Sequence, residues 1–337
     1  MKILIIGPSW VGDAVISQSL LKVIHSIRNE AEIDILSPEW TTKVFKRMDE
    51  VSEVITLPFI HGQIKLKERY EFGKSLVSRN YDQIIVLPNS LKSSLIPYFS
   101  KASIRTGWRG EMRYFLINDL RVLDKKAYPR MVDRFVALAL DKGSSLPSDI
   151  PLPELRVDEE NLLQLIKKYS IKIDTPLICL CPGAEFGPAK RWPASNFAQV
   201  ANAYLKKDWQ VILLGSENDV SVGKEITESV NKNLNFFNLI GKTKLEDVVD
   251  LLASSQLVLT NDSGLMHIAA SVQVPLLALF GPTSPNFTPP LSPKAKIIRK
   301  AKGYTKIRQG SLEGGYHQSL IDIKPPEVLE ALLESES

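Results

Sequence analysis

Short apolar runs alternate along the chain with longer stretches in which apolar residues recur at helical spacing. The short runs are rich in β-branched residues, as is typical of buried strands. In the first half, the expected strands and the helices that follow them are residues 3–6 and 14–27, 33–36 and 41–48, and 84–87 and 91–99. This alternation predicts βαβ units on a parallel sheet.

The alternation weakens after Lys142 and passes through GSSLPSDIPLPEL, residues 143–155, which is rich in Ser and Pro and typical of a linker. We therefore expect an N-terminal Rossmann-like domain over residues 1–150 and a second such domain over 151–322. The remaining residues, 323–337, contain a helix that starts at Pro325 and could pack back on the first domain.

A second alternating series follows the linker and resembles the first. Its expected strands are 177–181, 211–214, 257–260 and 276–280, and its expected helices are 194–207, 220–231 and 264–271. The fold class predicted is α/β, with two Rossmann-like domains whose parallel sheets face each other across a cleft. Ligand loops are then expected at the carboxyl ends of the strands.

Composition narrows the function classes. The chain has 337 residues, 44% of them hydrophobic and 24% charged, which suits two globular domains. Its 42 basic and 38 acidic residues give a net charge of +4, too small to imply a nucleic-acid partner. The only cysteines, Cys179 and Cys181, exclude a disulfide framework and favour the reducing cytoplasm.

Membrane contact is expected to be peripheral. The apolar run after Lys2 is too short for a secretory signal. No apolar stretch reaches the roughly 20 residues that a bilayer span needs.

The segment GPSWVGD, residues 7–13, lies where a dinucleotide fingerprint would, but Ser9 occupies the position of the second glycine. This argues against NAD, because that glycine lets the backbone approach a pyrophosphate. Asp13 then stands at a helix start, where it could serve as an N-cap. Aimed into a cleft, the same carboxylate is a candidate general base.

The loop CPGAEFGPAKRWP, residues 181–193, follows the first strand of the second domain. It combines glycines with Lys190 and Arg191, so free amides and cations meet in one place, as a diphosphate requires. The G-K-[ST] spacing of a Walker A loop is absent. The alternative is a structural loop whose two cations are solvated.

Two further strand ends carry acidic residues. After 211–214, Glu217 and Asp219 could bind ribose hydroxyls. After 257–260, the segment NDSGLMH places Asp262 either as an N-cap or in a sugar and phosphate site. His267 has no second histidine nearby, so we expect a hydrogen-bonding residue and propose no metal site.

Basic residues gather in two regions. Between positions 101 and 134 arginines dominate and alternate with aromatic residues, which suits binding of phosphate or carboxylate groups, although a solvated basic face is the alternative. From Lys294 to Arg308 there are seven basic residues and no acid. This stretch is either a second anion-facing loop or a surface that leans on an acidic membrane.

Seven motifs carry a resemblance to a known family. In chain order they are GPSWVGD, VLPNSLKSS, RTGWRGEMRY, CPGAEFGPAKRWP, TNDSGLMH, LFGPTSPNFTPPLS and GYHQSLIDI. Together they resemble the ADP-heptose:lipopolysaccharide heptosyltransferase II family of inverting glycosyltransferases. The resemblance implies a GT-B fold, an ADP-heptose donor and a lipid A inner-core acceptor that already carries Kdo and one heptose. It also implies an α-1,3-linked product.

By position, the resemblance implies that Asp13 is the catalytic base and Lys190 the diphosphate lysine. It implies that Glu217 binds the ribose of the donor, or Asp219 in its place. Where the first heptosyltransferase of the pathway has a Thr-Thr pair, this chain has Glu185 and Phe186, so backbone amides are expected to contact the phosphates. The expected donor-binding set is Gly183, Ala184, Glu185, Lys190, Glu217, Asp219, Asp262, Ser263, Gly264 and His267.

The acceptor carries carboxylates and phosphates, so its partners are expected among the cations of the first domain. The expected acceptor-binding set is Gly12, Lys92, Arg105, Arg109, Arg113, Arg130 and Arg134. A sugar nucleotide already carries a good leaving group, so the chemistry needs a base and positive charge but no resident cofactor. Mg²⁺ could assist without being essential.

Two other functions stay open. A sugar-nucleotide epimerase on a similar fold would need no acceptor and would leave the arginine-rich region unexplained. A non-catalytic lipopolysaccharide-binding protein would not need the nucleotide loops. For the transferase, we expect peripheral contact with the cytoplasmic face of the inner membrane.

Overall fold

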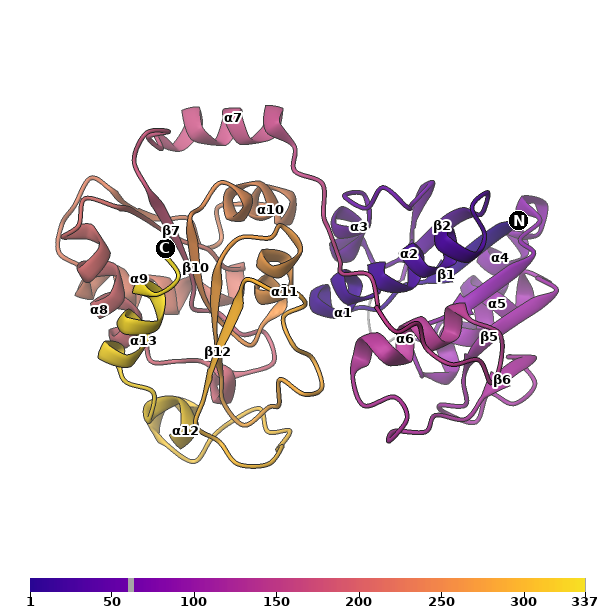
Figure 1. Ribbon diagram of the computed structural model, residues 1–337. Helices are drawn as coiled ribbons and strands as arrows, with labels where there is room; N and C mark the ends of the chain where they lie inside the picture. The colour runs from indigo at the N-terminus through magenta and orange to yellow at the C-terminus, as the bar shows by residue number, and fades with distance from the viewer. Residues whose placement is uncertain (60–63, 337) are drawn as a thin grey trace. The chain divides into compact units, whose positions relative to one another are not determined.

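The computed structural model describes residues 1–59 and 64–336 (Figure 1). The chain divides into two compact units, Met1–Pro153 and Glu154–Ser337. The division falls inside the Ser- and Pro-rich segment, close to the boundary expected at residue 150.

The first unit contains a six-stranded parallel sheet with strand order β3-β2-β1-β4-β5-β6. Its strands are β1 (Lys2–Ile6), β2 (Glu32–Ser37), β3 (Glu53–Thr56), β4 (Gln83–Val86), β5 (Ile104–Trp108) and β6 (Asp119–Arg121). Its α-helices are α1 (Val11–Ile16), α2 (Gln18–Ile27), α3 (Glu39–Phe45), α4 (Leu66–Ser75), α5 (Leu95–Phe99) and α6 (Met131–Ala139). Two short 3-10 helices, η1 (Val77–Arg79) and η2 (Leu91–Ser94), complete it.

The second unit repeats this plan with strand order β12-β11-β10-β7-β8-β9, again parallel. Its strands are β7 (Leu177–Cys181), β8 (Gln210–Leu213), β9 (Phe236–Asn238), β10 (Leu257–Asn261), β11 (Leu276–Phe280) and β12 (Ala295–Arg299). Its helices are α7 (Glu159–Tyr169), η3 (Pro188–Lys190), α8 (Ala194–Leu205), η4 (Glu217–Asp219), α9 (Val220–Ser229), α10 (Leu245–Ala253), α11 (Gly264–Ser271), η5 (Glu313–Gly315), α12 (Gln318–Ile321) and α13 (Pro325–Leu333).

The central strands are buried on both faces, which explains their continuous apolar runs. All five residues of β7, β10 and β11 are buried, and only the first residue of β1 is not. Since every pair of neighbouring strands is parallel, the carboxyl ends in each unit meet at one edge of its sheet. The loops that carry the candidate chemistry therefore gather at that edge.

The sequence did not predict the strands at the sheet margins. β3 and β12 contain no fully buried residue, and β6 and β9 have three residues each. Edge strands are covered on fewer sides, so their sequences lack the apolar run that marks a central strand.

The helix expected over residues 14–27 is divided into α1 and α2 at Ser17. The hydroxyl of Ser17 donates a hydrogen bond to the carbonyl of Ala14 at 2.7 Å, a local bond that competes with regular helix geometry.

The C-terminal helix α13 packs against α8 within the second unit. Val328 and Leu332 are fully buried in the core of that unit, beside Leu320 and Ile323. The apolar face of α13 therefore belongs to the core of the second unit, and the expectation that residues 323–337 pack back on the first domain stays a prediction.

No helix in the described part of the chain is long and apolar enough to cross a bilayer.

Candidate active site

Lys190 and Asp262 meet at the carboxyl edge of the second unit. Lys190 ends η3 in the loop after β7, and Asp262 follows β10, the neighbouring strand. The Nζ atom of Lys190 lies 2.6 Å from Oδ2 of Asp262, and the side chains are 14% and 5% exposed. The hydroxyl of Thr283, after β11, donates to the same oxygen at 2.5 Å. Three neighbouring loops thus hold one ammonium at a ligand-accessible edge.

His267 lies buried in α11, behind this ion pair. Burial lowers the pKa of His267 to about 4, with Asp262 opposing the shift and Lys190 adding to it. The imidazole is therefore neutral at pH 7. The expectation that His267 acts as a hydrogen-bonding residue stays a prediction.

The start of α11 offers a free hydroxyl. Ser263 is the N-cap residue, and its Oγ is buried and has no hydrogen-bond partner in the described structure. Asp262 is therefore not the N-cap and pairs with Lys190 instead. A buried hydroxyl without a partner next to helix amides suits a sugar or phosphate oxygen.

The two candidates for the ribose differ in their surroundings. Asp219 is buried, accepts hydrogen bonds from the backbone and hydroxyl of Ser216, and pairs with Arg191 at 3.1 Å. Gly183 is required beside it, because a Cβ at that position would collide with the Asp219 carboxylate. Glu217 is exposed on η4. The geometry therefore favours Glu217 for contact with a ligand.

The remaining members of the donor set lie in the same loops. Ala184 is buried after β7, and Glu185 is exposed and accepts from Asn218 at 3.2 Å. Gly264 begins α11.

Two residues that the sequence analysis did not select hold the loop after β7 in place. The Asn261 side chain donates to the carbonyl of Pro182 at 2.7 Å and accepts from the backbone of Trp192 at 3.1 Å. The indole of Trp192 is fully buried and donates to the carbonyl of Ile323 at 2.9 Å. The available signal was a polar residue directly before Asp262 and a tryptophan directly after the basic pair.

In the first unit, Asp13 lies in the first turn of α1, half-buried. The N-cap of that helix is Trp10, so the capping role considered for Asp13 does not hold. Gly12 is buried beside it. Asp13 follows β1 at the carboxyl edge of the sheet, where a base for a ligand would be expected.

The same edge holds a pocket of about 570 Å³. Its lining comes from the segments after β1, β2, β3, β4 and β5 and from α4 and α5. It includes Ser9, Trp40, Arg69, Lys92 and Glu111. The indole of Trp40 donates to the carbonyl of Ser9 at 2.7 Å, which fixes the loop before Asp13. Of the expected acceptor residues, Lys92 lines this pocket. Trp40 and Arg69 were not selected from the sequence.

The structure corrects the role expected for Arg113. Arg113 is fully buried and donates to the carbonyls of Trp108 and Pro88, and burial lowers its pKa to about 10. Arg105 donates to the carbonyls of Ala102 and Leu116. The Arg113 guanidinium is enclosed within the unit and is not placed to contact an acceptor, whereas Arg105 is half-buried and its acceptor role stays a prediction.

Of the other three arginines, Arg109 and Arg130 are exposed, and Arg134 is half-buried like Arg105. Arg130 pairs with Asp133 at 2.7 Å at the start of α6. Arg134, on α6, donates to the carbonyl of Tyr128 at 3.0 Å. Arg109 is exposed and directly follows β5 at the carboxyl edge. Arg109 and Lys92 are therefore the acceptor candidates that the geometry favours.

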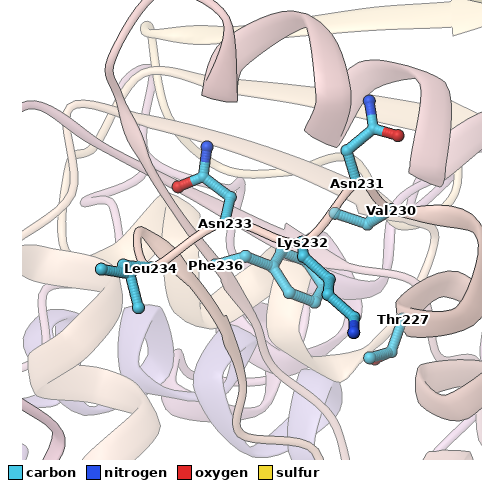
Figure 2. Close-up of a pocket in the computed structure, with 7 residues that line it drawn as sticks. All are labelled: Thr227, Val230, Asn231, Lys232, Asn233, Leu234 and Phe236. Atoms are coloured by element: carbon cyan, nitrogen blue, oxygen red, sulfur yellow. The ribbon is translucent and has the colours of Figure 1, made fainter.

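A further pocket, of about 450 Å³, lies on the second unit between the end of α9 and the start of β9 (Figure 2). Its lining residues are Thr227, Val230, Asn231, Lys232, Asn233, Leu234 and Phe236. It opens at the amino end of β9, opposite the loops that carry Lys190 and Asp262. It therefore belongs to no part of the candidate site.

Among the described residues, no group of three or more His, Cys, Asp and Glu side chains is placed to hold a metal ion. The role of Mg²⁺ stays a prediction.

Two parallel Rossmann-like sheets, the second with a basic loop and a helix start at its carboxyl edge, are the architecture of the GT-B glycosyltransferases. Residues 69–317 match the sequence family described as glycosyltransferase family 9 (heptosyltransferase). The chain belongs to glycosyltransferase family 9 and is a heptosyltransferase.

Known heptosyltransferases are similar to this chain over almost its full length. The chain is 50% identical to lipopolysaccharide heptosyltransferase 2 of Salmonella typhimurium, over 98% of this chain and 97% of the relative. It is also 50% identical to lipooligosaccharide heptosyltransferase 2 of Haemophilus influenzae, over 99% of each chain. The structure of E. coli ADP-heptose LPS heptosyltransferase II matches with a TM-score of 0.91 and 46% identity, covering 100% of this chain and 98% of that one.

Proposed function

We propose that the chain transfers L-glycero-D-manno-heptose from ADP-heptose to the first heptose of heptosyl-Kdo2-lipid A. The reaction would proceed with inversion and form an α-1,3 linkage. The observation that carries the proposal is the Lys190, Asp262 and Thr283 cluster beside the unpartnered hydroxyl of Ser263. The names of the full-length relatives support heptose transfer to lipopolysaccharide or lipooligosaccharide, and the name of the E. coli structure supports ADP-heptose as the donor.

The donor would bind to the second unit. Lys190 and the amides of the loop after β7 would face the diphosphate, and Glu217 the ribose. Asp262, Ser263 and Gly264 would face the heptose and its phosphate. As the bond to the diphosphate breaks, negative charge grows on the leaving group. Lys190 therefore stabilises the transition state more than it stabilises the bound donor.

The acceptor would bind to the first unit. Asp13 would accept the proton of the acceptor hydroxyl as that oxygen attacks the anomeric carbon. Attack from the face opposite the diphosphate inverts the configuration. Lys92 and Arg109 would pair with the carboxylates and phosphates of the acceptor. No resident cofactor is needed, since ADP is already a good leaving group.

Peripheral contact with the inner membrane is part of the proposal, because the acceptor is a lipid. The segment after β5 supports it. Met112 is 83% exposed and Phe115 is 91% exposed, close to the exposed Arg109. Exposed apolar side chains next to a cation suit the surface of an anionic membrane.

Incubation with ADP-heptose, with and without acceptor, tests the function. A transferase releases ADP only when the acceptor is present, and product analysis should show an α-1,3-linked heptose. An epimerase would convert the sugar nucleotide without acceptor. A binding protein would release no ADP in either case, and either result would overturn the proposal.

A further inference from the structure

The basic stretch that begins at Lys294 continues beyond β12 and returns across the carboxyl edge of the second unit. The backbone of Thr305 donates to the carbonyl of Pro282 at 2.9 Å, in the loop after β11. The backbone of Ala189 donates to the carbonyl of Arg308 at 3.1 Å. Residues 305–308 are therefore attached to the loop that carries Lys190 and to the loop that carries Thr283, the residue that donates to Asp262.

Gly187 makes the second attachment possible. It has a φ of +144°, and a Cβ at this position would collide with the carbonyl of Arg308. Only glycine allows this conformation together with so close an approach. The loop after β7 is thus shaped to receive residues 305–308.

The side chains of the two segments meet at the ring of Phe186. Its centroid lies 5.6 Å from the ammonium of Lys190, 5.8 Å from that of Lys306 and 5.4 Å from the guanidinium carbon of Arg308. An aromatic face attracts cations electrostatically, so one ring gathers three of them.

Three like charges around one ring repel one another. Lys190 is paired with Asp262. In the part of the chain that the structure describes, no carboxylate forms an ion pair with Lys306 or Arg308. A small, highly charged anion would relieve the repulsion and use all three cations.

We propose that Lys306 and Arg308, together with Lys190 and the ring of Phe186, form a cationic clamp for the diphosphate of the donor. The inference rests on the proposed function, because it assumes that the donor is a nucleoside diphosphate sugar. It gives Phe186 a role in a loop where hydroxyl side chains would otherwise be expected to contact phosphate. It also assigns the end of the basic stretch to the donor rather than to the membrane.

Calorimetric titration with ADP, inorganic pyrophosphate and adenosine tests the clamp. For Lys306→Ala and Arg308→Ala, the dissociation constants of ADP and pyrophosphate should each rise by about tenfold, because each variant removes one charged phosphate contact. The affinity for adenosine should be unchanged. Phe186→Leu should also raise the dissociation constant of ADP, because it keeps an apolar side chain but removes the aromatic face.

Lys302→Ala is the matched control. Lys302 is exposed in the same basic stretch and has no contact with Phe186. The Lys302→Ala substitution removes the same charge. If it weakens ADP and pyrophosphate binding as much as Lys306→Ala does, general electrostatic attraction explains the effect and the clamp is overturned. Thermal unfolding of each variant shows whether the fold is kept.

The pyrophosphate titration separates the clamp from the proposed function. If the wild-type chain binds pyrophosphate but not ADP, the proposed donor is wrong while the clamp stands. If it binds neither, or if the Lys306 and Arg308 variants bind both like wild type, the clamp is overturned. Sedimentation with phosphatidylglycerol vesicles covers the other source of phosphate. If the Lys306→Ala and Arg308→Ala variants lose vesicle binding but keep the ADP affinity of the wild type, residues 305–308 form a lipid-facing surface, contrary to the proposal.

Discussion

The ammonium of Lys190 is held 2.6 Å from the carboxylate of Asp262, so the cation expected to face the diphosphate already has an anionic partner. The pair fixes the position of the ammonium before a ligand arrives. It also means that a bound diphosphate must share or displace Asp262. Substitutions at either position should therefore change both stability and ligand binding.

Lys190→Ala should weaken ADP binding and lower kcat together. It should also lower the free energy of unfolding by about 2 kcal/mol, because the buried Asp262 loses its counter-ion. Combining Lys190→Met with Asp262→Asn should restore stability, since no buried charge is left unpaired, while ADP binding stays weak. Calorimetry and thermal unfolding measure both effects. A change in stability alone would make the pair purely structural.

Asp13→Asn should reduce turnover by about 10²- to 10⁴-fold, because an amide cannot accept the proton of the acceptor. The affinity for ADP should be kept. Glu39→Gln is the matched control, since Glu39 occupies the first turn of α3 at the same edge of the sheet. Turnover close to wild type in Asp13→Asn would leave the carboxylate with a role in helix α1 only.

His267 should make stability depend on pH. Burial lowers its pKa to about 4 from the ordinary 6.5, so between these values the unfolded chain binds more protons than the folded one. The contribution of His267 to the free energy of unfolding is fully present above pH 6.5. It should be lost as the pH falls towards 4, and the total loss is about 3 kcal/mol. His267→Gln should flatten this slope in pH-dependent urea unfolding. Equal slopes in wild type and His267→Gln would contradict the burial of a neutral imidazole.

Arg109→Ala should raise the KM for the acceptor several-fold and leave the affinity for ADP unchanged. The acceptor KM of the wild type should rise with ionic strength, because salt screens the attraction between exposed charges. Lys101→Asn is the control. It removes an exposed charge just before β5, at the other edge of the sheet, and Asn tolerates the φ of +59° found there. If Arg109→Ala weakens the binding of ADP and of the acceptor equally, the acceptor is not bound at this position.

Transfer should survive chelation at least in part, because Lys190 and helix amides can supply the positive charge that the leaving diphosphate needs. Initial rates with and without EDTA measure this directly. Complete loss of activity on chelation, restored by added Mg²⁺, would show that a cation is required. Asp262 would then be the first ligand to test.

The central strands could be predicted from the sequence because burial on both faces imposes an unbroken apolar run. The expected strand over residues 177–181 coincides with β7, and the expected helices at 264–271 and 325–333 coincide with α11 and α13. What α13 packs against could not be predicted. The periodic apolar residues of α13 show that one face of the helix is buried, but they do not identify the element that packs against that face.

The site was predictable to the level of the loop. Strand ends in a parallel sheet share one edge, so Lys190 and Asp262 could be grouped before their contact was known. Side-chain roles depend on neighbours from distant segments. Nothing in the local sequence shows that Arg113 is enclosed by the carbonyls of Trp108 and Pro88, or that Arg308 reaches Phe186.

The hydrogen bond from the indole of Trp192 to the carbonyl of Ile323 joins residues that are 131 positions apart. During synthesis, Trp192 leaves the ribosome on the order of ten seconds before Ile323 at typical bacterial elongation rates. Over that interval the loop that contains Lys190 lacks the partner that fixes its tryptophan. A nascent chain therefore has a fully supported loop around Lys190 only after Ile323 has left the ribosome.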